Sequence, residues 1–361
     1  MRIKNLKLKN FRNYADETVN FSDGLNVLFG RNAQGKTNCA EAVFYLCTGT
    51  SPRARRDKQL IRHGEECAEI SALAEGRYGD VEISAKIYEN SREVRINGNK
   101  ITKNADILGN IYSVFFSPHE LRLIQDGPDE RRRFLNVSIS QLSKPYYVAL
   151  MRYNKILEQR NNLLKNRDIS MVYDTLPVWD EQLCKYAATI ASKRAEFCSK
   201  LSPIAERIHS ELCDGAEKLE VSPEKKYKGD EKQLSERLFA ELSANYERDI
   251  RLGFTASGPH RDDLDIVING EDAKAFASQG QTRTAALSIK LAEVEIFKET
   301  AGEYPVLILD DVMSELDLPR RKKLAERTQG LQTILTCTHA ERVLYGKQTS
   351  RIRIENGKVK Q

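Results

Sequence analysis

The alternation of apolar and polar residues predicts strands at the start of the chain. Leu6 and Leu8 alternate with lysines, which is typical of a half-exposed strand. Residues 25–29 (LNVLF) predict a buried strand, followed by a glycine-rich turn and a helix with one apolar face. Three further runs of period two are separated by turn signals such as Asn97-Gly98, and they predict an antiparallel meander: residues 70–74, 81–87 and 94–96.

From about residue 129 the apolar period becomes helical. Two sets of positions repeat every seven residues, the second four places after the first: Leu183, Ile190, Phe197 and Ile204, then Ala187, Arg194, Leu201 and Ile208. This spacing predicts a coiled-coil-like helix that lies along another helix, with one charged residue in the seam. Strand signals return at residues 264–268 and 306–309. We therefore expect an α/β fold in three parts: residues 1–128, a helical insertion at 129–250, and residues 251–361.

Composition narrows the class of protein. The chain has 361 residues, 40% of them hydrophobic and 30% charged, with no apolar run long enough to cross a membrane. Its first residues alternate charged with apolar side chains, unlike a signal peptide. The seven cysteines form no C-x-x-C pair, which disfavours a disulfide framework or a zinc site. We expect a reduced, cytoplasmic protein.

The net charge of +5 is small, but basic residues cluster in two places. The clusters are Arg2, Lys4, Lys7, Lys9 and Arg12, and then Arg53, Arg55, Arg56, Lys58 and Arg62. Such runs are most often solvated faces. If DNA binds here, the candidate contacts to its backbone are Arg53, Arg55, Arg56 and Lys58.

Residues 30–37 (GRNAQGKT) satisfy the pattern G-x-x-x-x-G-K-[ST] between a predicted strand and a predicted helix. In such a loop the backbone N–H groups surround phosphates, helped by the positive end of the helix dipole. Lys36 can reach the β- and γ-phosphates, and the Thr37 hydroxyl can bind Mg²⁺. The expected nucleotide-binding residues are Gly30, Arg31, Asn32, Ala33, Gln34, Gly35, Lys36 and Thr37.

A second motif, residues 306–311 (VLILDD), predicts a buried strand that ends in two acids. Asp310 is placed to hold the magnesium ion, and Asp311 could polarise an attacking water. A plain core strand followed by an acidic turn is the alternative. The phosphate loop earlier in the chain favours the functional interpretation.

The order of the remaining motifs resembles the head of an ABC ATPase of the SMC type. Lys36 and Asp310 are 274 positions apart, and a signature-like Ser278-Gln279-Gly280-Gln281 lies between them. Residues 314–317 resemble a D-loop, and a switch histidine, His339, follows the apolar run at residues 333–335. The resemblance implies that Ser278, Gly280 and Gln281 contact nucleotide, and that His339 senses the γ-phosphate with Asp311 as the catalytic acid.

More closely, the chain resembles the RecF family of bacterial recombination mediators. The strings that carry this resemblance lie at residues 10–14, 30–38, 56–62, 116–118, 127–135, 258–263 and 278–281. It implies ATP and Mg²⁺ as cofactors, an ATP-dependent homodimer on double-stranded DNA near single-strand gaps, and slow, DNA-stimulated hydrolysis. It also implies RecR and RecO as partners in recombinase loading, and a cytoplasmic, nucleoid-associated location.

Some residues depart from the ABC pattern and leave alternatives open. Gln279 replaces a small residue, Asp311 replaces a glutamate, and residues 117–120 lack the expected Q-loop glutamine. A non-hydrolysing structural clamp therefore remains an alternative, and a transporter ATPase subunit is a weaker one. Arg131, Arg132 and Arg133 could contact DNA or pair within the chain, and His260 could be functional or structural.

Overall fold

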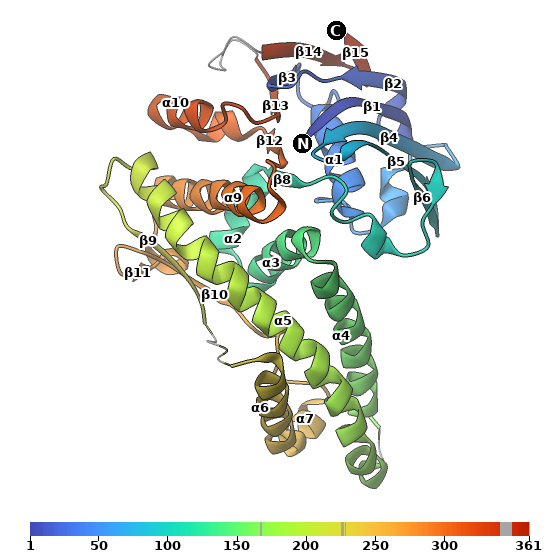
Figure 1. Ribbon diagram of the computed structural model, residues 1–361, viewed down its shortest axis with the longest axis vertical. Helices are drawn as coiled ribbons and strands as arrows, with labels where there is room; N and C mark the ends of the chain where they lie inside the picture. The colour runs from blue at the N-terminus through green and yellow to red at the C-terminus, as the bar shows by residue number, and fades with distance from the viewer. Residues whose placement is uncertain (167, 225–226, 228, 340–348, 361) are drawn as a thin grey trace. The chain divides into compact units, whose positions relative to one another are not determined.

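The computed structural model describes residues 1–166, 168–224, 227, 229–339 and 349–360 (Figure 1). The chain divides into two compact units. The first unit consists of Met1–Leu121, Ile208–Ala216 and Ser278–Gln361, and the second of Arg122–Arg207 and Glu217–Ala277. No helix among the described residues is both long enough and apolar enough to cross a membrane.

This division differs from the expected boundaries at residues 128 and 250. The strand that we expected to begin the C-terminal part, β10 (Leu264–Ile268), pairs antiparallel with β9 (Leu219–Pro223) in the second unit. The chain therefore stays in the second unit until Ala277. Strand β9 is short and isolated among helical patterns, so the sequence did not reveal this partner.

The first unit has a mostly parallel sheet in the order β15-β14-β3-β13-β12-β8 within the described part of the chain. Its strands are β3 (Leu25–Phe29), β8 (Ser113–Phe116), β12 (Val306–Asp310), β13 (Thr333–Cys337), β14 (Thr349–Glu355) and β15 (Lys358–Lys360). Strand β13 lies between β3 and β12 and is parallel to both. The phosphate loop and the acid pair therefore leave the sheet at the same edge.

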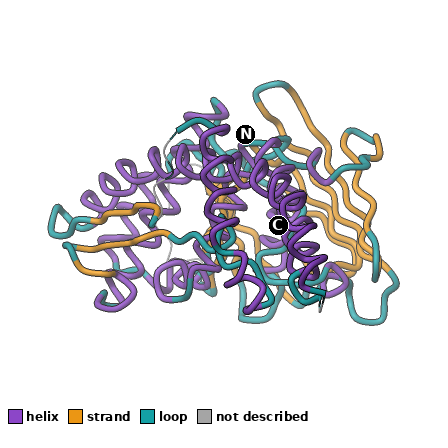
Figure 2. The backbone as a smooth tube through the Cα atoms, turned by 90° about the horizontal axis from the view of Figure 1, so that it is seen from below, coloured by secondary structure: helices purple, strands orange, loops and turns teal. Residues whose placement is uncertain are grey.

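The second sheet of this unit is the expected antiparallel meander, extended by the first two strands (Figure 2). Its strands are β1 (Arg2–Phe11), β2 (Tyr14–Asn20), β4 (Cys67–Gly76), β5 (Gly79–Tyr88), β6 (Arg92–Ile96) and β7 (Asn99–Lys100). Helix α1 (Lys36–Thr48) contacts strands of both sheets. It is buried on almost every side, which explains its weak amphipathic pattern. Helices α9 (Gln279–Ala301) and α10 (Leu318–Arg327) complete the unit.

The second unit is mainly helical. Its helices are α2 (Arg122–Gln125), α3 (Pro128–Leu142), α4 (Lys144–Leu163), most of α5 (Ile169–Leu212), α6 (Glu231–Ala244), α7 (Tyr246–Leu252) and α8 (Ala273–Phe276). Strands β9, β10 and β11 (Glu271–Asp272) form a small sheet beside them. Helix α5 contacts α3 through Phe197 and Phe134, whose ring centroids lie 6.1 Å apart, as the seven-residue repeat predicts.

Two buried arginines of this unit, one of them the charged residue of the α5 seam, bind the string at residues 258–263. Arg194 is 5% exposed and donates to the Pro259 carbonyl at 2.6 Å. Arg131 forms a double hydrogen bond with Asp263, at 2.5 and 2.8 Å. The sequence left two interpretations of the arginines at residues 131–133, contact with DNA or pairing within the chain. The structure shows pairing within the chain for Arg131. His260 likewise has internal partners, the Tyr153 hydroxyl and the Thr255 carbonyl.

Candidate nucleotide site

The phosphate loop folds between β3 and α1 as the sequence predicts. Lys36 is 7% exposed, and its ammonium donates to the carbonyls of Gly30 (2.7 Å) and Arg31 (2.8 Å). Burial lowers the pKa of Lys36, while the charge of Asp311 opposes that shift. The loop residues Arg31, Asn32 and Ala33 are exposed. The lysine is thus held across a loop whose residues 31–33 are exposed.

Segments far away in the sequence hold this loop in place. The Gln34 carbonyl accepts hydrogen bonds from the Asn13 side chain (2.8 Å) and from the Gly357 N–H (2.9 Å). The Gln34 side chain accepts another from the Asn356 N–H (2.6 Å), and the Tyr14 hydroxyl donates to the Gly35 carbonyl. Gly357 has a φ of +69°, and a Cβ there would lie 2.3 Å from the Asn13 carbonyl oxygen. Only glycine fits this turn.

Sequence reasoning missed these supporting residues. Asn13 and Tyr14 lie in one of the strings that carry the resemblance to the RecF family, and Asn356-Gly357 is a dipeptide typical of hairpin turns. Neither signal says that the two segments meet at Gln34. Their role in holding the loop follows from the tertiary structure alone.

The two predicted metal ligands, Thr37 and Asp310, are in contact although 273 positions separate them in the sequence. The Thr37 hydroxyl donates to the Asp310 carboxylate at 2.8 Å, and the Thr336 hydroxyl donates to the same oxygen at 2.7 Å. Burial raises the pKa of Asp310, which is 6% exposed, and the two hydroxyls oppose the shift. A carboxylate and a hydroxyl at one point are the hard oxygen ligands that Mg²⁺ prefers. The residues present therefore fit this ion.

The two predicted catalytic residues lie at the same edge of the sheet. Asp311 is exposed, and its N–H donates to Thr336, the neighbour of Asp310 on the adjacent strand. Its φ of +56° turns the chain sharply after β12. His339 is exposed and follows the end of β13 by two residues. Both side chains are accessible to a bound nucleotide or water.

The signature residues lie at the exposed start of α9. Ser278 caps this helix by accepting from the Gln281 N–H at 3.2 Å, and the Gln281 side chain accepts from the Ser278 N–H at 2.9 Å. Ser278 and Gly280 are exposed. Within the described residues, no hydrogen bond joins Ser278, Gly280 or Gln281 to the phosphate loop. The signature is therefore free to meet another molecule.

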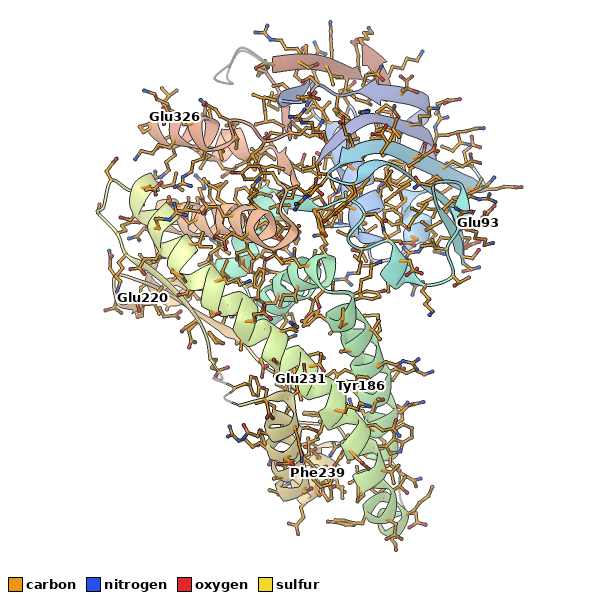
Figure 3. All side chains as sticks on the ribbon, viewed as in Figure 1. Glu93, Tyr186, Glu220, Glu231, Phe239 and Glu326 are labelled. Carbon is orange, nitrogen blue, oxygen red and sulfur yellow. The ribbon has the colours of Figure 1, made fainter. Side chains whose placement is uncertain are left out.

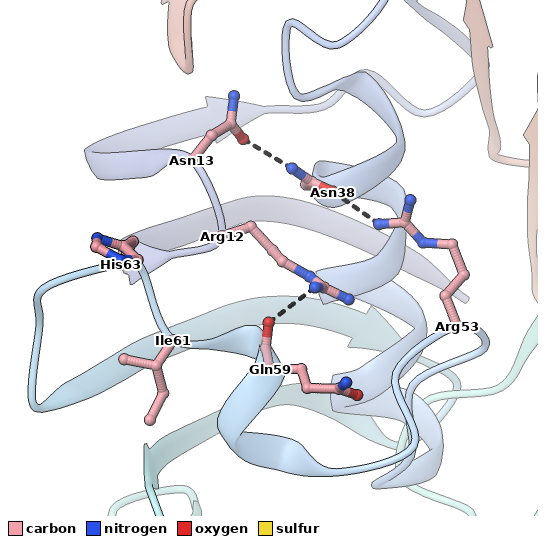
Figure 4. Close-up of a pocket in the computed structure, with 7 residues that line it drawn as sticks. All are labelled: Arg12, Asn13, Asn38, Arg53, Gln59, Ile61 and His63. Atoms are coloured by element: carbon pink, nitrogen blue, oxygen red, sulfur yellow. Dashed lines mark hydrogen bonds between the residues drawn. The ribbon is translucent and has the colours of Figure 1, made fainter.

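A cavity of about 480 Å³ lies beside the start of α1 (Figure 4). Its lining residues are Arg12, Asn13, Asn38, Arg53, Gln59, Ile61 and His63. Asn38 directly follows Thr37, so the cavity borders the phosphate loop. Arg53 donates to the Asn38 side chain at 2.7 Å, and Asn38 donates to Asn13 at 2.8 Å (Figure 4). The sequence did not predict this cavity.

The expected DNA contacts differ in the partners that they have within the chain. Arg53 forms an ion pair with Glu41 at 2.7 Å, and Arg12 binds the same carboxylate at 2.8 Å. Glu41 is fully buried and the Arg53 side chain is 39% exposed, so Arg53 is paired within the first unit and still reaches solvent. Lys58 pairs with exposed Glu89 at 3.1 Å, and a pair of that kind breaks easily. Arg55 and Arg56 are exposed and stay available as candidates.

Replacing Glu41 with glutamine should lower the free energy of unfolding by about 3 kcal/mol, because two guanidinium groups lose a buried carboxylate partner. Chemical denaturation followed by circular dichroism measures the change. Glu89→Gln, which removes the exposed partner of Lys58, is the matched control and should cost less than about 0.5 kcal/mol. Equal stability of the two variants would contradict a structural role for Glu41.

The contribution of Glu41 should also depend on pH. Burial raises the pKa of Glu41, but hydrogen bonds from Arg12, Arg53 and Ser51 outweigh burial and leave it below its ordinary value. A carboxyl with a lowered pKa stabilises the fold above its unfolded pKa and loses that effect as the pH falls through its folded pKa. The stability difference between wild type and Glu41→Gln should therefore shrink below about pH 4.

Comparisons with known proteins identify the family. Residues 2–361 match the family described as the RecF/RecN/SMC N-terminal domain. The DNA replication and repair protein RecF of Clostridium acetobutylicum is 41% identical over 362 residues, which cover 99% of each chain. RecF of Lachnoclostridium phytofermentans is 42% identical over 356 residues, covering 98% of this chain and 97% of its own.

Solved structures agree with the sequence relatives. A structure described as the recombination mediator protein RecF with ATP, in the RecFOR pathway, superposes with a TM-score of 0.91 at 35% identity, covering 99% of this chain and 97% of its own. The Smc head of Pyrococcus yayanosii, at 15% identity and a TM-score of 0.59, shares the fold. The expected fold class, an SMC-type ATPase head with a helical insertion, is confirmed. The chain belongs to the RecF family of SMC-type ATPases.

Proposed function

We propose that the chain is an ATP-dependent switch that acts on double-stranded DNA in recombinational repair and in maintenance of replication forks. The observation that carries the proposal is the meeting of Thr37 and Asp310, 2.8 Å apart, beside the lysine of a phosphate loop. A relative with the same fold over almost the whole chain is described with ATP.

ATP is proposed to bind with its phosphates on residues 30–37 and its ribose and base toward the cavity beside Asn38. Thr37 and Asp310 would hold Mg²⁺, which neutralises charge that develops on the phosphates. Asp311 would orient the attacking water and His339 would contact the γ-phosphate. Because Asp311 is one methylene shorter than glutamate and such chemistry is sensitive to about 1 Å, hydrolysis should be slow.

A second copy of the chain would complete each nucleotide site. Of the signature residues Ser278, Gly280 and Gln281, the first two are exposed, and none of the three forms a hydrogen bond with the phosphate loop of its own chain within the described residues. In the closed homodimer each signature would meet the γ-phosphate held by the other chain. ATP would thus stabilise the dimer and hydrolysis would release it.

The proposed substrate is duplex DNA near single-strand gaps, bound through its backbone. RecR and RecO are the proposed partners in recombinase loading, since the structural relatives are described as part of the RecFOR pathway. A protein with this role is proposed to be located in the cytoplasm, in association with the nucleoid. Arg55 and Arg56 supply exposed positive charge on the first unit.

Turnover of Mg-ATP, measured with and without duplex DNA, tests the proposal. We expect slow hydrolysis that duplex DNA accelerates. ATP-dependent dimers without any turnover would indicate the alternative, a non-hydrolysing clamp, which the short side chain of Asp311 favours. Failure to bind ATP at all would refute both.

A further inference from the structure

One face of α4, in the second unit, carries cations that have no carboxylate partner in the described part of the chain. Lys144, Arg152 and Lys155 are all exposed. Among the described residues, none of the three lies within 4.0 Å of a carboxylate. At 3.6 residues per turn they fall on the same side of the helix, and they span about 16 Å along its axis. Together they form a row of positive charge, which we call the α4 row.

The opposite side of α4 packs into the unit. Its buried residues are Tyr146, Ala149, Leu150, Tyr153, Ile156 and Arg160. Side chains on the other side of the helix extend into solvent (Figure 3). Val148 and Met151 lie there among the cations, 46% and 44% exposed. Two aliphatic side chains are too few for the core of a protein interface, so charge is the dominant feature of this face.

Three other lysines of the unit differ from the α4 row because they have carboxylate partners. Lys193 and Lys200 pair with Glu196, at 2.8 and 3.8 Å. Lys218 pairs with Glu220 at 2.9 Å. An ion-paired lysine must give up its carboxylate before it can bind another anion. The α4 row needs no such exchange.

The position of Lys144 is unfavourable for the helix itself. Lys144 is the first residue of α4, and the first turn contains no acid. The N-terminus of a helix carries partial positive charge, so a cation there is repelled. The local electrostatics thus oppose this lysine, and a negatively charged ligand would reverse the effect.

We infer that the α4 row binds the phosphates of double-stranded DNA. The inference rests on the proposed function and adds a contact surface on the second unit. Duplex DNA carries one negative charge per 1.7 Å of axis, so a 16 Å row runs beside about ten phosphate charges. Contacts of this kind position the protein without reading sequence.

Fluorescence anisotropy with a labelled 30-base-pair duplex tests the inference on the whole chain. Mg²⁺ and a non-hydrolysable ATP analogue are present, and the salt concentration is varied. In the triple variant Lys144→Gln, Arg152→Gln, Lys155→Gln, the slope of log affinity against log salt should become shallower by about 2.7, or 0.9 per lost phosphate contact. The loss should be the same for duplexes of different sequence.

The matched control is Lys193→Gln, Lys200→Gln, Lys218→Gln, which removes the same charge from paired positions of the same unit. Its salt slope should stay close to that of wild type. The inference would be overturned if the α4 variant bound duplex DNA with the affinity and the salt slope of wild type. That result would indicate an acidic protein as the partner of this face. A wild-type chain that binds no duplex would instead overturn the DNA part of the proposed function. Thermal melting of each variant checks that it is folded.

Discussion

Lys36→Ala should weaken the binding of ATP more than 100-fold while the chain stays folded. The Lys36 ammonium is held by the carbonyls of Gly30 and Arg31 at the loop where the β- and γ-phosphates are proposed to lie. Losing charge-assisted hydrogen bonds to phosphate costs about 3 kcal/mol, and each 1.4 kcal/mol is a factor of ten in affinity. Isothermal titration calorimetry with Mg-ATP measures the effect.

Lys36→Arg is the companion variant, because it keeps the charge but replaces a compact ammonium by a planar guanidinium. It should bind ATP better than Lys36→Ala and still fail to retain DNA in the presence of ATP. The thermal midpoints of both variants without nucleotide should stay close to that of wild type. ATP affinity of Lys36→Ala equal to that of wild type would mean that the loop does not bind the triphosphate.

Ser278→Arg should abolish ATP-dependent dimerisation and leave ATP binding by the monomer intact. Ser278 is exposed at the start of α9, where a long side chain would obstruct an approaching chain without disturbing the core. Analytical ultracentrifugation with ATP, with ADP and without nucleotide measures the dimer fraction. Only ATP has the γ-phosphate that can favour the closed state. Equal dimer fractions in all three conditions for wild type would contradict the switch.

Ser278→Ala is the control for the helix cap. Ser278 accepts a hydrogen bond from the Gln281 N–H, and loss of such a cap costs about 1 kcal/mol. Ser278→Ala removes the cap without adding bulk, so it should retain more of the dimer than Ser278→Arg. A mixture of Ser278→Arg and Asp311→Asn chains should regain hydrolysis at one composite site per dimer. No recovery would argue against a signature that acts on the other chain.

Much of the first unit could be predicted because its signals are local. The meander strands follow from alternation and turn residues, and β3 and β12 follow from apolar runs next to motifs. The boundary at residue 250 was wrong because β10 belongs with β9, a pairing across about 45 residues that no local pattern specifies. Secondary-structure propensity and hydrophobic period describe single segments, whereas tertiary packing decides which β-strands pair with each other.

For the candidate site, too, the sequence predicted what local signals carry and not what tertiary packing decides. The residues of the phosphate loop and Asp310 could be named from spacing and residue type alone. The charge of Arg53 suggested DNA, but its partner is Glu41, a buried acid within a helix that the sequence pattern presents only as apolar. Which cations are neutralised is a property of the folded chain. For that reason neither the ion pairs of residues 53–58 nor the α4 row could be predicted from the sequence, and contact of residues 53–58 with DNA stays a prediction.

The hydrogen bond between Gln34 and Asn356 has a consequence for synthesis of the protein. The two residues are 322 positions apart. At about 5–20 residues per second, a ribosome needs about 16–64 s to make the intervening chain. A nascent chain can form β1, β2 and α1 early, yet its phosphate loop lacks one of its supports until the β14–β15 hairpin emerges. Growing chains should therefore capture ATP poorly until translation is almost complete, which would limit premature assembly of unfinished heads on DNA.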